Sequence, residues 1–153
     1  MSLLSAKDLG KGRTLYQLKV LKDNYTYVLA WDHQAFVVDP GEEKPVLDLI
    51  KEKELTLKNI LITHYHQDHT GGNELLQEKT GCLVIGPEDE RVPRLAQSVD
   101  DGEELIFGPF SIQRRRKRKT VASASAMAAA RSRIHIFGVH PVLLAASAAA
   151  RKS

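Results

Sequence analysis

The sequence predicts an α/β fold of the α+β kind, in which an antiparallel, strand-rich first part precedes alternating helices and strands. Two patterns predict it. Three strand-like segments follow one another between residues 14 and 38, and short apolar runs alternate with helical patterns from residue 45 onward. The composition agrees, because 42% hydrophobic and 27% charged residues in a chain of 153 are typical of a globular protein with one core.

The first three predicted strands form an antiparallel meander, because their connections are too short for any other arrangement. Their predicted ranges are residues 14–21, 25–31 and 35–38. In the first of them, Tyr16, Leu18 and Val20 share one face, which is the period of two expected for a half-buried strand. A turn at Asp23 and Asn24 joins it to the second strand, and a hairpin loop joins the second to the third.

The later elements alternate between helix and strand. Further strands are predicted at residues 60–62, 82–85, 104–107 and 110–112. Pro45 suits the first turn of a helix that carries apolar residues on one face. A second helix is predicted over residues 73–79, ending at Gly81. Because the run 60–62 is wholly apolar, we expect that strand to be buried on both sides.

The charge divides the chain into two parts. Residues 1–112 contain 12 Lys and Arg against all 19 Asp and Glu, whereas residues 113–153 contain 10 Lys and Arg and no acidic residue. The second part is also rich in alanine and serine. We therefore expect a domain over residues 1–112 and a basic Ala/Arg/Ser-rich tail over residues 113–153.

Several classes of protein are excluded. No stretch approaches the ~20 apolar residues of a membrane span, so neither an integral membrane protein nor a membrane partner is expected. The first residues lack the pattern of a secretory signal. The single cysteine, Cys82, rules out an intrachain disulfide framework and is consistent with a reducing compartment. These features predict a cytoplasmic protein.

A cluster of potential metal ligands follows the buried strand at residues 60–62. His64, His66, Asp68 and His69 lie within six positions, and imidazole and carboxylate groups are usual ligands of zinc. His64 and His66 can point the same way and hold one ion, while Asp68 and His69 can reach a second. A histidine-rich surface loop is the alternative. The position after a buried strand, where open α/β sheets present ligand sites, favours metal binding.

This His-x-His-x-Asp-His segment resembles the metallo-β-lactamase superfamily. Three further blocks, at residues 21–29 (Leu-Lys-Asp-Asn-Tyr-Thr-Tyr-Val-Leu), 37–41 and 70–73, are similar to the hydroxyacylglutathione hydrolases, or glyoxalase II enzymes. The resemblance extends over about residues 15–112. It implies that this part forms the N-terminal half of a metallo-β-lactamase-type αββα sandwich.

The resemblance implies a metal-dependent hydrolase with two divalent ions, zinc or alternatively iron or manganese. Its implied substrate is a small-molecule glutathione thioester such as lactoylglutathione, hydrolysed to a hydroxy acid and glutathione. His64 and His66 would bind the first ion and Asp68 and His69 the second, with Asp68 also the catalytic residue that orients the attacking hydroxide. Asp39 would hold ligands or loop backbone in place, or serve only as a turn residue before Pro40. Another superfamily lactonase or thioesterase is the alternative activity.

The chain departs from the family pattern after Ile112. The resemblance requires a further histidine, a bridging aspartate and a late histidine, but no acidic residue follows Glu104. The remaining histidines, His135 and His140, lack the family's surroundings, and we interpret both as chance occurrences. We therefore expect an incomplete site with weak metal binding and slow hydrolysis.

Three interpretations of the tail remain open: a translated frameshift or misread splice, a nuclear address, and a basic arm that binds nucleic acid through residues 114–119. The last would make the chain a non-enzymatic binding protein. The first is favoured because the break falls inside the expected fold. Half of a sandwich should also leave Leu18, Val20 and Leu29 without a covering layer, which would lower stability.

Overall fold

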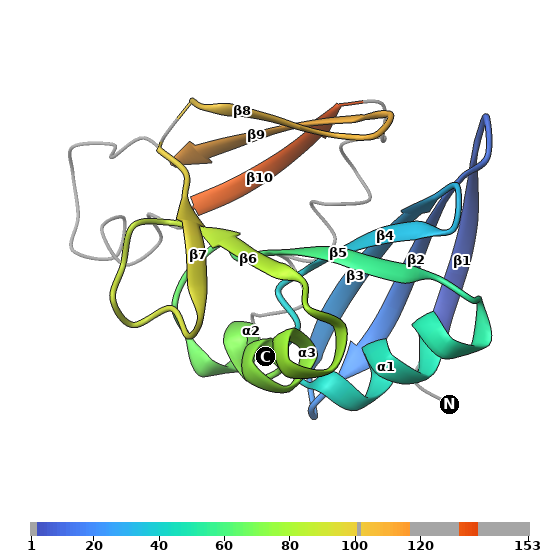
Figure 1. Ribbon diagram of the computed structural model, residues 1–153, viewed down its shortest axis with the longest axis horizontal. Coiled ribbons are helices and arrows are strands. Elements are labelled where there is room, and N and C mark those ends of the chain that lie inside the picture. Colours follow the sequence, from blue (N-terminus) through green and yellow to red (C-terminus); the bar gives the residue numbers. More distant parts are fainter. Residues whose placement is uncertain (1–2, 101, 117–131, 138–153) are drawn as a thin grey trace.

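The computed structural model describes residues 3–100, 102–116 and 132–137, which form two β-sheets and three helices (Figure 1). The larger sheet contains seven strands in sequence order: β1 (Leu3–Gly10), β2 (Arg13–Val20), β3 (Asn24–Trp31), β4 (Gln34–Val38), β5 (Thr56–Leu61), β6 (Leu83–Gly86) and β7 (Leu95–Ser98). Strands β1 to β4 pair antiparallel, and β4 to β7 pair parallel. The predicted mixture of meander and alternating elements is confirmed.

Local turn chemistry explains the antiparallel part. Asp32 and His33 connect β3 to β4 with φ angles of 43° and 59°, which is the twist that a two-residue hairpin requires. Aspartate tolerates this left-handed region better than most residues. The strand β1 was not predicted, because its residues do not alternate. It lies at the edge of the sheet and is mostly exposed.

Two helices cover one face of the larger sheet. They are α1 (Glu43–Glu52) and α3 (Asn73–Thr80), seen together below the sheet in Figure 1. Val46 and Leu49 of α1 and Leu76 of α3 pack in one core cluster with residues of β3, β4 and β5. The helix α3 ends at Gly81, whose φ of 72° confirms the predicted stop.

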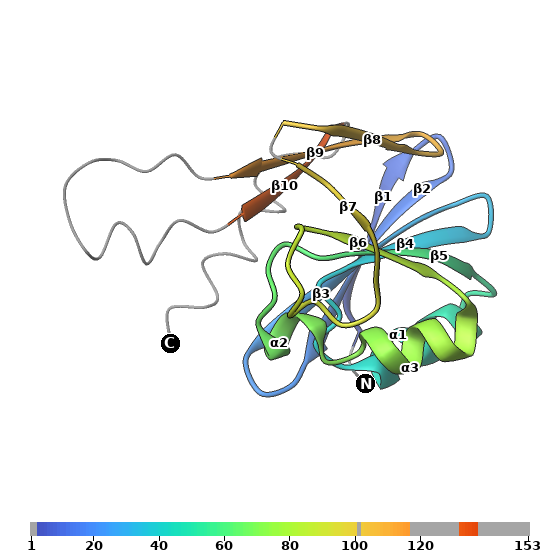
Figure 2. The same cartoon turned by 60° about the vertical axis from the view of Figure 1, so that its left-hand side comes forward.

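A second sheet covers the other face of the larger one. It contains β8 (Glu104–Phe107), β9 (Phe110–Arg116) and β10 (Ser132–Phe137), in the order β10-β9-β8 (Figures 1 and 2). Phe110 and Ile112 of β9 pack in a second core cluster with Leu29 and Phe36 of the larger sheet. The described residues therefore form three layers: helices, a large sheet and a small sheet.

The two covering layers correct one expectation. Leu18, Val20 and Leu29, which were expected to lack a covering layer, have at most 1% of their surface exposed. Leu18 packs in the cluster on the helix side, and Leu29 packs in the cluster under the second sheet. The physical reason is that the helices cover one face of the large sheet, while the hairpin that carries the large aromatic residue Phe110 covers the other.

The predicted boundary at Ile112 lies within β9, which continues to Arg116 and pairs with β10 along its length. Residues 117–131 and 138–153 lie outside the described residues, and with them most of the tail and half of the basic run 114–119. The division into a domain and a tail, and the nucleic-acid interpretation, stay predictions. Within the described parts of the chain, no helix has the length and apolar character needed to cross a membrane.

Candidate metal centre

Three loops meet at the end of the larger sheet where the parallel strands β4 and β5 finish. The β4–α1 loop is tied to β5 by a hydrogen bond from the Asp39 amide to the Leu61 carbonyl, 2.9 Å. It is tied to the segment before α3 by a bond from the Gly72 amide to the Pro40 carbonyl, 2.8 Å. The β2–β3 loop joins them through the Leu21 amide, which donates to the Glu42 carboxylate at 2.9 Å. The carboxyl ends of parallel strands are the usual position of a site in such sheets.

Two glycines let these loops approach closely. A Cβ on Gly41 would lie nearer to the Asp68 backbone oxygen than real Cβ atoms come to any neighbour, and a Cβ on Gly71 would meet the Gly41 carbonyl in the same way. The obstacles are backbone atoms, which cannot rotate aside as a flexible side chain can. Gly41 therefore sets how closely the loop carrying Asp68 packs on the β4–α1 loop.

Gly41→Ala should lower the free energy of unfolding by about 1–3 kcal/mol, the usual cost of forcing a methyl group into packed structure. It should also weaken metal binding, because relief of the contact moves Asp68 away from its neighbours. Gly81→Ala is the matched control: its Cβ would meet nothing within 4 Å, and its φ of 72° alone gives a cost of about 1–2 kcal/mol. Urea unfolding and zinc titration of both variants check this. A Gly41→Ala chain that binds zinc as well as the Gly81→Ala chain would contradict it.

The four residues singled out by the sequence lie next to one another, and two of them, His64 and His69, converge with Asp39. Their positions are set by the end of β5 and by the single helical turn α2 (Gln67–Thr70). The ring centroid of His64 lies 4.7 Å from that of His66 and 4.1 Å from that of His69. The His69 Nε2 atom lies 3.3 Å from the Asp68 Oδ2 atom. His69 is buried, whereas the Asp68 side chain is 45% exposed, so the cluster opens to solvent on its aspartate side.

The buried residue Asp39 holds part of this cluster in place through hydrogen bonds. One carboxylate oxygen accepts from the Thr63 amide at 2.8 Å, and the other accepts from the Thr63 hydroxyl at 2.6 Å and from His69 Nδ1 at 2.9 Å. Burial by itself raises the pKa of the Asp39 carboxyl, but the bonds from His69 and Thr63 and the charge of His69 outweigh it, so the pKa lies below its ordinary value. Asp39 is therefore ionised at neutral pH.

The Asp39 carboxylate fixes the proton positions on two histidines. A carboxylate only accepts, so His69 carries a proton on Nδ1; in the neutral ring, the form that binds a metal, the lone pair is then on Nε2, which faces Asp68. The Thr63 hydroxyl has one proton and donates it to Asp39, so it must accept from His64 Nδ1, 2.8 Å away. The neutral form of His64 therefore also has its lone pair on Nε2. This is the arrangement of carboxylate-supported histidine ligands in metal sites.

The geometry fits a divalent ion. Two lone-pair atoms, His69 Nε2 and Asp68 Oδ2, lie 3.3 Å apart, and two ligands at ~2.0–2.1 Å from one tetrahedral ion are separated by ~3.4 Å. Candidate ligand atoms of Asp39, His64 and His69 also lie within 4.8 Å of one another. Both Asp39 oxygens already accept hydrogen bonds, so we assign Asp39 to orienting the histidines and not to the ion.

Asn24 holds Asp68 through two hydrogen bonds. The Asn24 side-chain amide donates to the Asp68 backbone oxygen at 3.0 Å and to its Oδ2 atom at 2.9 Å. Burial raises the pKa of the Asp68 carboxyl, but the Asn24 bond and the positive charges of His69 and His64 lower it further, so the net shift is downward. The carboxylate is thus ionised and available to a cation at neutral pH.

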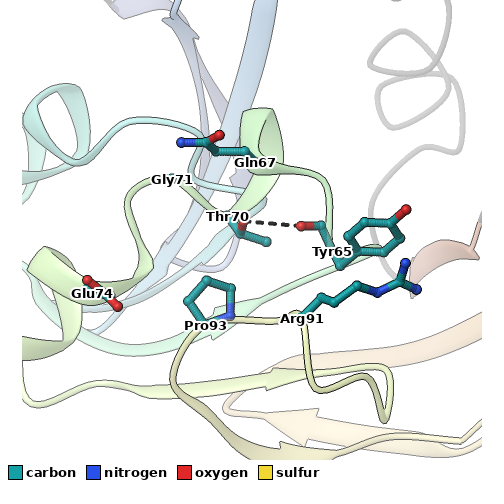
Figure 3. Close-up of a pocket in the computed structure, with 7 residues that line it drawn as sticks. All are labelled: Tyr65, Gln67, Thr70, Gly71, Glu74, Arg91 and Pro93. Atoms are coloured by element: carbon teal, nitrogen blue, oxygen red, sulfur yellow. Dashed lines mark hydrogen bonds between the residues drawn. The ribbon is translucent and has the colours of Figure 1, made fainter.

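A cavity of about 340 Å³ lies beside α2 (Figure 3). Its lining residues are Tyr65, Gln67, Thr70, Gly71, Glu74, Arg91 and Pro93. The Arg91 guanidinium lies 3.4 Å from the Tyr65 ring centroid and pairs with Asp89, and this bond lowers the pKa of Asp89 to about 2. The Tyr65 ring in turn lies 4.7 Å from the His66 ring. Tyr65 therefore lies between Arg91 and His66 and contacts both.

From the sequence, Thr63 had no assigned role, and Asn24 was placed in a turn and in a block that resembles glyoxalase II. The signal for Thr63 was its place directly between the buried strand and the histidine segment. No local signal pointed to the contact of Asn24 with Asp68, because the two residues are 44 positions apart. Of the two later histidines, His135 lies on β10 opposite Gln113, and His140 lies outside the described residues.

Comparisons with known proteins agree on one family. A family model described as the metallo-beta-lactamase superfamily matches residues 22–145. The hydroxyacylglutathione hydrolases of Photobacterium profundum and Nitrosomonas europaea are 42% and 33% identical to this chain over 98 and 99 residues. These alignments cover 62% and 65% of this chain but 39% and 38% of the relatives. The chain thus spans about two fifths of the length of the curated relatives that it matches.

Solved structures show the same fold. ETHE1 of Myxococcus xanthus superposes with a TM-score of 0.57 at 28% identity, over 65% of this chain and 46% of its own. The metallo-beta-lactamase BLEG-1 superposes with a TM-score of 0.62 at 20% identity, over 69% of this chain and 62% of its own. These relatives represent one class of α/β proteins, which bind divalent metals. This chain is a member of that class and belongs to the metallo-β-lactamase superfamily, whose family match spans most of its residues.

Proposed function

We propose that this chain carries the first metal-binding half-site of a hydrolase that cleaves glutathione thioesters, in the manner of glyoxalase II. The proposal rests on one observation: His64, Asp68 and His69 lie close together, and Asp39 fixes the position of the ring proton of His69. The identity of 33–42% to hydroxyacylglutathione hydrolases supports the thioester substrate.

In this proposal His64 and His66 would hold one zinc ion, and Asp68 and His69 would hold the second. When bound, such ions lower the pKa of water and polarise a carbonyl group, which is the chemistry that hydrolysis of a thioester needs. The chain's own residues supply the rest. Asp39 and Thr63 keep the protons of His69 and His64 on Nδ1, so that their Nε2 atoms would hold the cations. Asp68, half-exposed and ionised, would orient the attacking water on the open side. The thiolate product leaves without a dedicated acid.

We expect the 153-residue chain to bind zinc weakly and to hydrolyse lactoylglutathione slowly, because no acidic residue after Glu104 can bridge two ions. His66→Ala should abolish both the binding and the thiol release. His33→Ala, a change in an exposed turn between β3 and β4, should alter neither. Zinc titration by calorimetry and a thiol-release assay on the zinc-loaded chain check this. Thiol release that survives in the His66→Ala chain would refute the proposal.

The same site could act as a lactonase or as another thioesterase of the superfamily. Parallel assays with a lactone, a β-lactam and a thioester that lacks the glutathionyl group separate these activities. Preference for the glutathione thioester by at least tenfold in kcat/KM is the expected result. Equal rates with and without the glutathionyl group would indicate a general thioesterase.

A further inference from the structure

The block Asp-Asn-Tyr at residues 23–25 belongs to one of the segments that resemble glyoxalase II enzymes, and the proposed chemistry does not use it. In the structure Asn24 begins β3, where its backbone pairs with Val20 of β2. Its side chain extends to the metal-ligand segment and donates two hydrogen bonds to one residue, Asp68.

Neighbouring contacts fix the backbone from which this side chain extends. The Leu21 amide donates to the Glu42 carboxylate at 2.9 Å, which ties the β2–β3 loop to the loop after β4. A Cβ on Gly41 would contact both the Leu21 side chain, at 3.2 Å, and the Asp68 backbone, so both loops pack closely against Gly41. The loop that leads to Asn24 is therefore held next to the Asp68 backbone.

The two bonds determine the rotamer of Asp68. An amide nitrogen has two hydrogens, and here one is directed to the Asp68 backbone oxygen at 3.0 Å and the other to its Oδ2 atom at 2.9 Å. This holds the carboxylate over its own backbone with Oδ2 near His69 Nε2, 3.3 Å away. Asp68 is 45% exposed and lies on a four-residue helix, so packing alone would leave its side chain free to rotate.

We propose that Asn24 is a positioning residue that holds the Asp68 carboxylate in the orientation that binds the ion shared with His69. The inference rests on the proposed function, since it requires that Asp68 and His69 take a metal. By this inference, the Asp-Asn-Tyr block orients Asp68, a metal ligand that is distant from it in the sequence. A side chain without N–H donors at this position leaves Asp68 to spend part of its time turned toward solvent.

The test compares Asn24→Ala and Asn24→Leu with the unsubstituted 153-residue chain. Leucine keeps about the volume of asparagine but has no donor, so it separates hydrogen bonding from packing. Gln17→Ala is the control, because Gln17 is also a partly buried amide but donates to the Tyr27 hydroxyl on β3. Cobalt and zinc affinities are measured by chelator competition, with the visible spectrum of the cobalt form and the melting temperature of each metal-free chain.

We expect both Asn24 variants to lose about tenfold in metal affinity, the usual effect of removing a group that orients a ligand, and to show an altered cobalt spectrum. The Gln17→Ala chain should stay within twofold. Affinity within twofold for both Asn24 variants, or full affinity restored by leucine, would overturn the inference while leaving the proposed function intact.

A second measurement needs no variant. In a zinc titration followed by NMR, the side-chain amide signals of Asn24 should move together with the ring signals of His69. Asn24 signals that stay fixed while His69 responds would overturn the inference. If the unsubstituted chain binds neither zinc nor cobalt, the proposed function fails and this inference fails with it. If it binds zinc but releases no thiol from a thioester, only the proposed substrate is refuted.

Discussion

Phe110→Ala should lower the free energy of unfolding by about 3–5 kcal/mol, the cost of removing a buried phenylalanine from a packed core. Phe110 is completely buried. Its ring meets Trp31 edge-on at a centroid distance of 5.6 Å and Phe36 at 5.5 Å. These contacts join β9 of the small sheet to β3 and β4 of the large one. Loss of the ring would therefore uncover the face of the large sheet that the small sheet covers.

The same small sheet provides the control for this prediction. Ile106 of β8 has 74% of its surface exposed, so Ile106→Ala should change the free energy of unfolding by less than about 0.5 kcal/mol. Urea unfolding followed by tryptophan fluorescence measures both variants, since Trp31 lies against Phe110. A cost below about 1 kcal/mol for Phe110→Ala would show that the two sheets do not share a core.

Asp39→Asn should weaken zinc binding by about 10–100-fold, although the side chain keeps its size. The carboxylate accepts from Thr63 and from His69 Nδ1. An amide has one oxygen, so its NH₂ group must replace either Oδ1 or Oδ2. At the Oδ2 position it faces both the Thr63 hydroxyl and His69 Nδ1, so the His69 ring must move its proton to Nε2 and the lone pair that would bind the ion is lost. At the Oδ1 position it faces the Thr63 backbone N–H, and that hydrogen bond is lost because both groups are donors.

Asp39→Asn should also change the dependence of stability on acid. The pKa of the Asp39 carboxyl is lower in the folded chain than the ordinary value of 3.8. Ionised Asp39 therefore stabilises the folded state fully above about pH 4, and this contribution is lost as the pH falls through the lowered pKa. The metal-free Asp39→Asn chain should be less stable at pH 7 but should lose less stability than the unsubstituted chain on acidification below pH 4.

Asp32→Asn is the matched control, because Asp32 lies in the exposed β3–β4 turn and asparagine accepts its φ of 43° equally well. Zinc titration and urea unfolding from pH 7 to pH 2.5 are measured on the three chains. Zinc affinity of the Asp39→Asn chain equal to that of the Asp32→Asn chain would contradict the assigned role of Asp39. If the free energies of unfolding of the Asp39→Asn chain and the unsubstituted chain fall equally below pH 4, the lowered pKa of Asp39 is contradicted.

Local patterns were sufficient for most elements. The alternation of Tyr16, Leu18 and Val20 predicted β2. Pro45 predicted the start of α1, and Gly81 predicted the end of α3. The strands β1 and β7 were missed because mostly exposed edge strands need no hydrophobic alternation. The four-residue helix α2 was missed because one helical turn carries no periodic signal.

The sequence by itself determined the family resemblance and the candidate metal ligands, because His64, His66, Asp68 and His69 lie within six positions and carry their chemistry in their side chains. Only the tertiary structure decided what supports them. Thr63 and Asp39 fix the histidine protons, and Asn24 holds Asp68 across 44 residues of chain. It also decided that Phe110 covers the sheet face that had been expected to be bare. Such contacts depend on which loops and layers meet in space, and no pattern local to the chain records that.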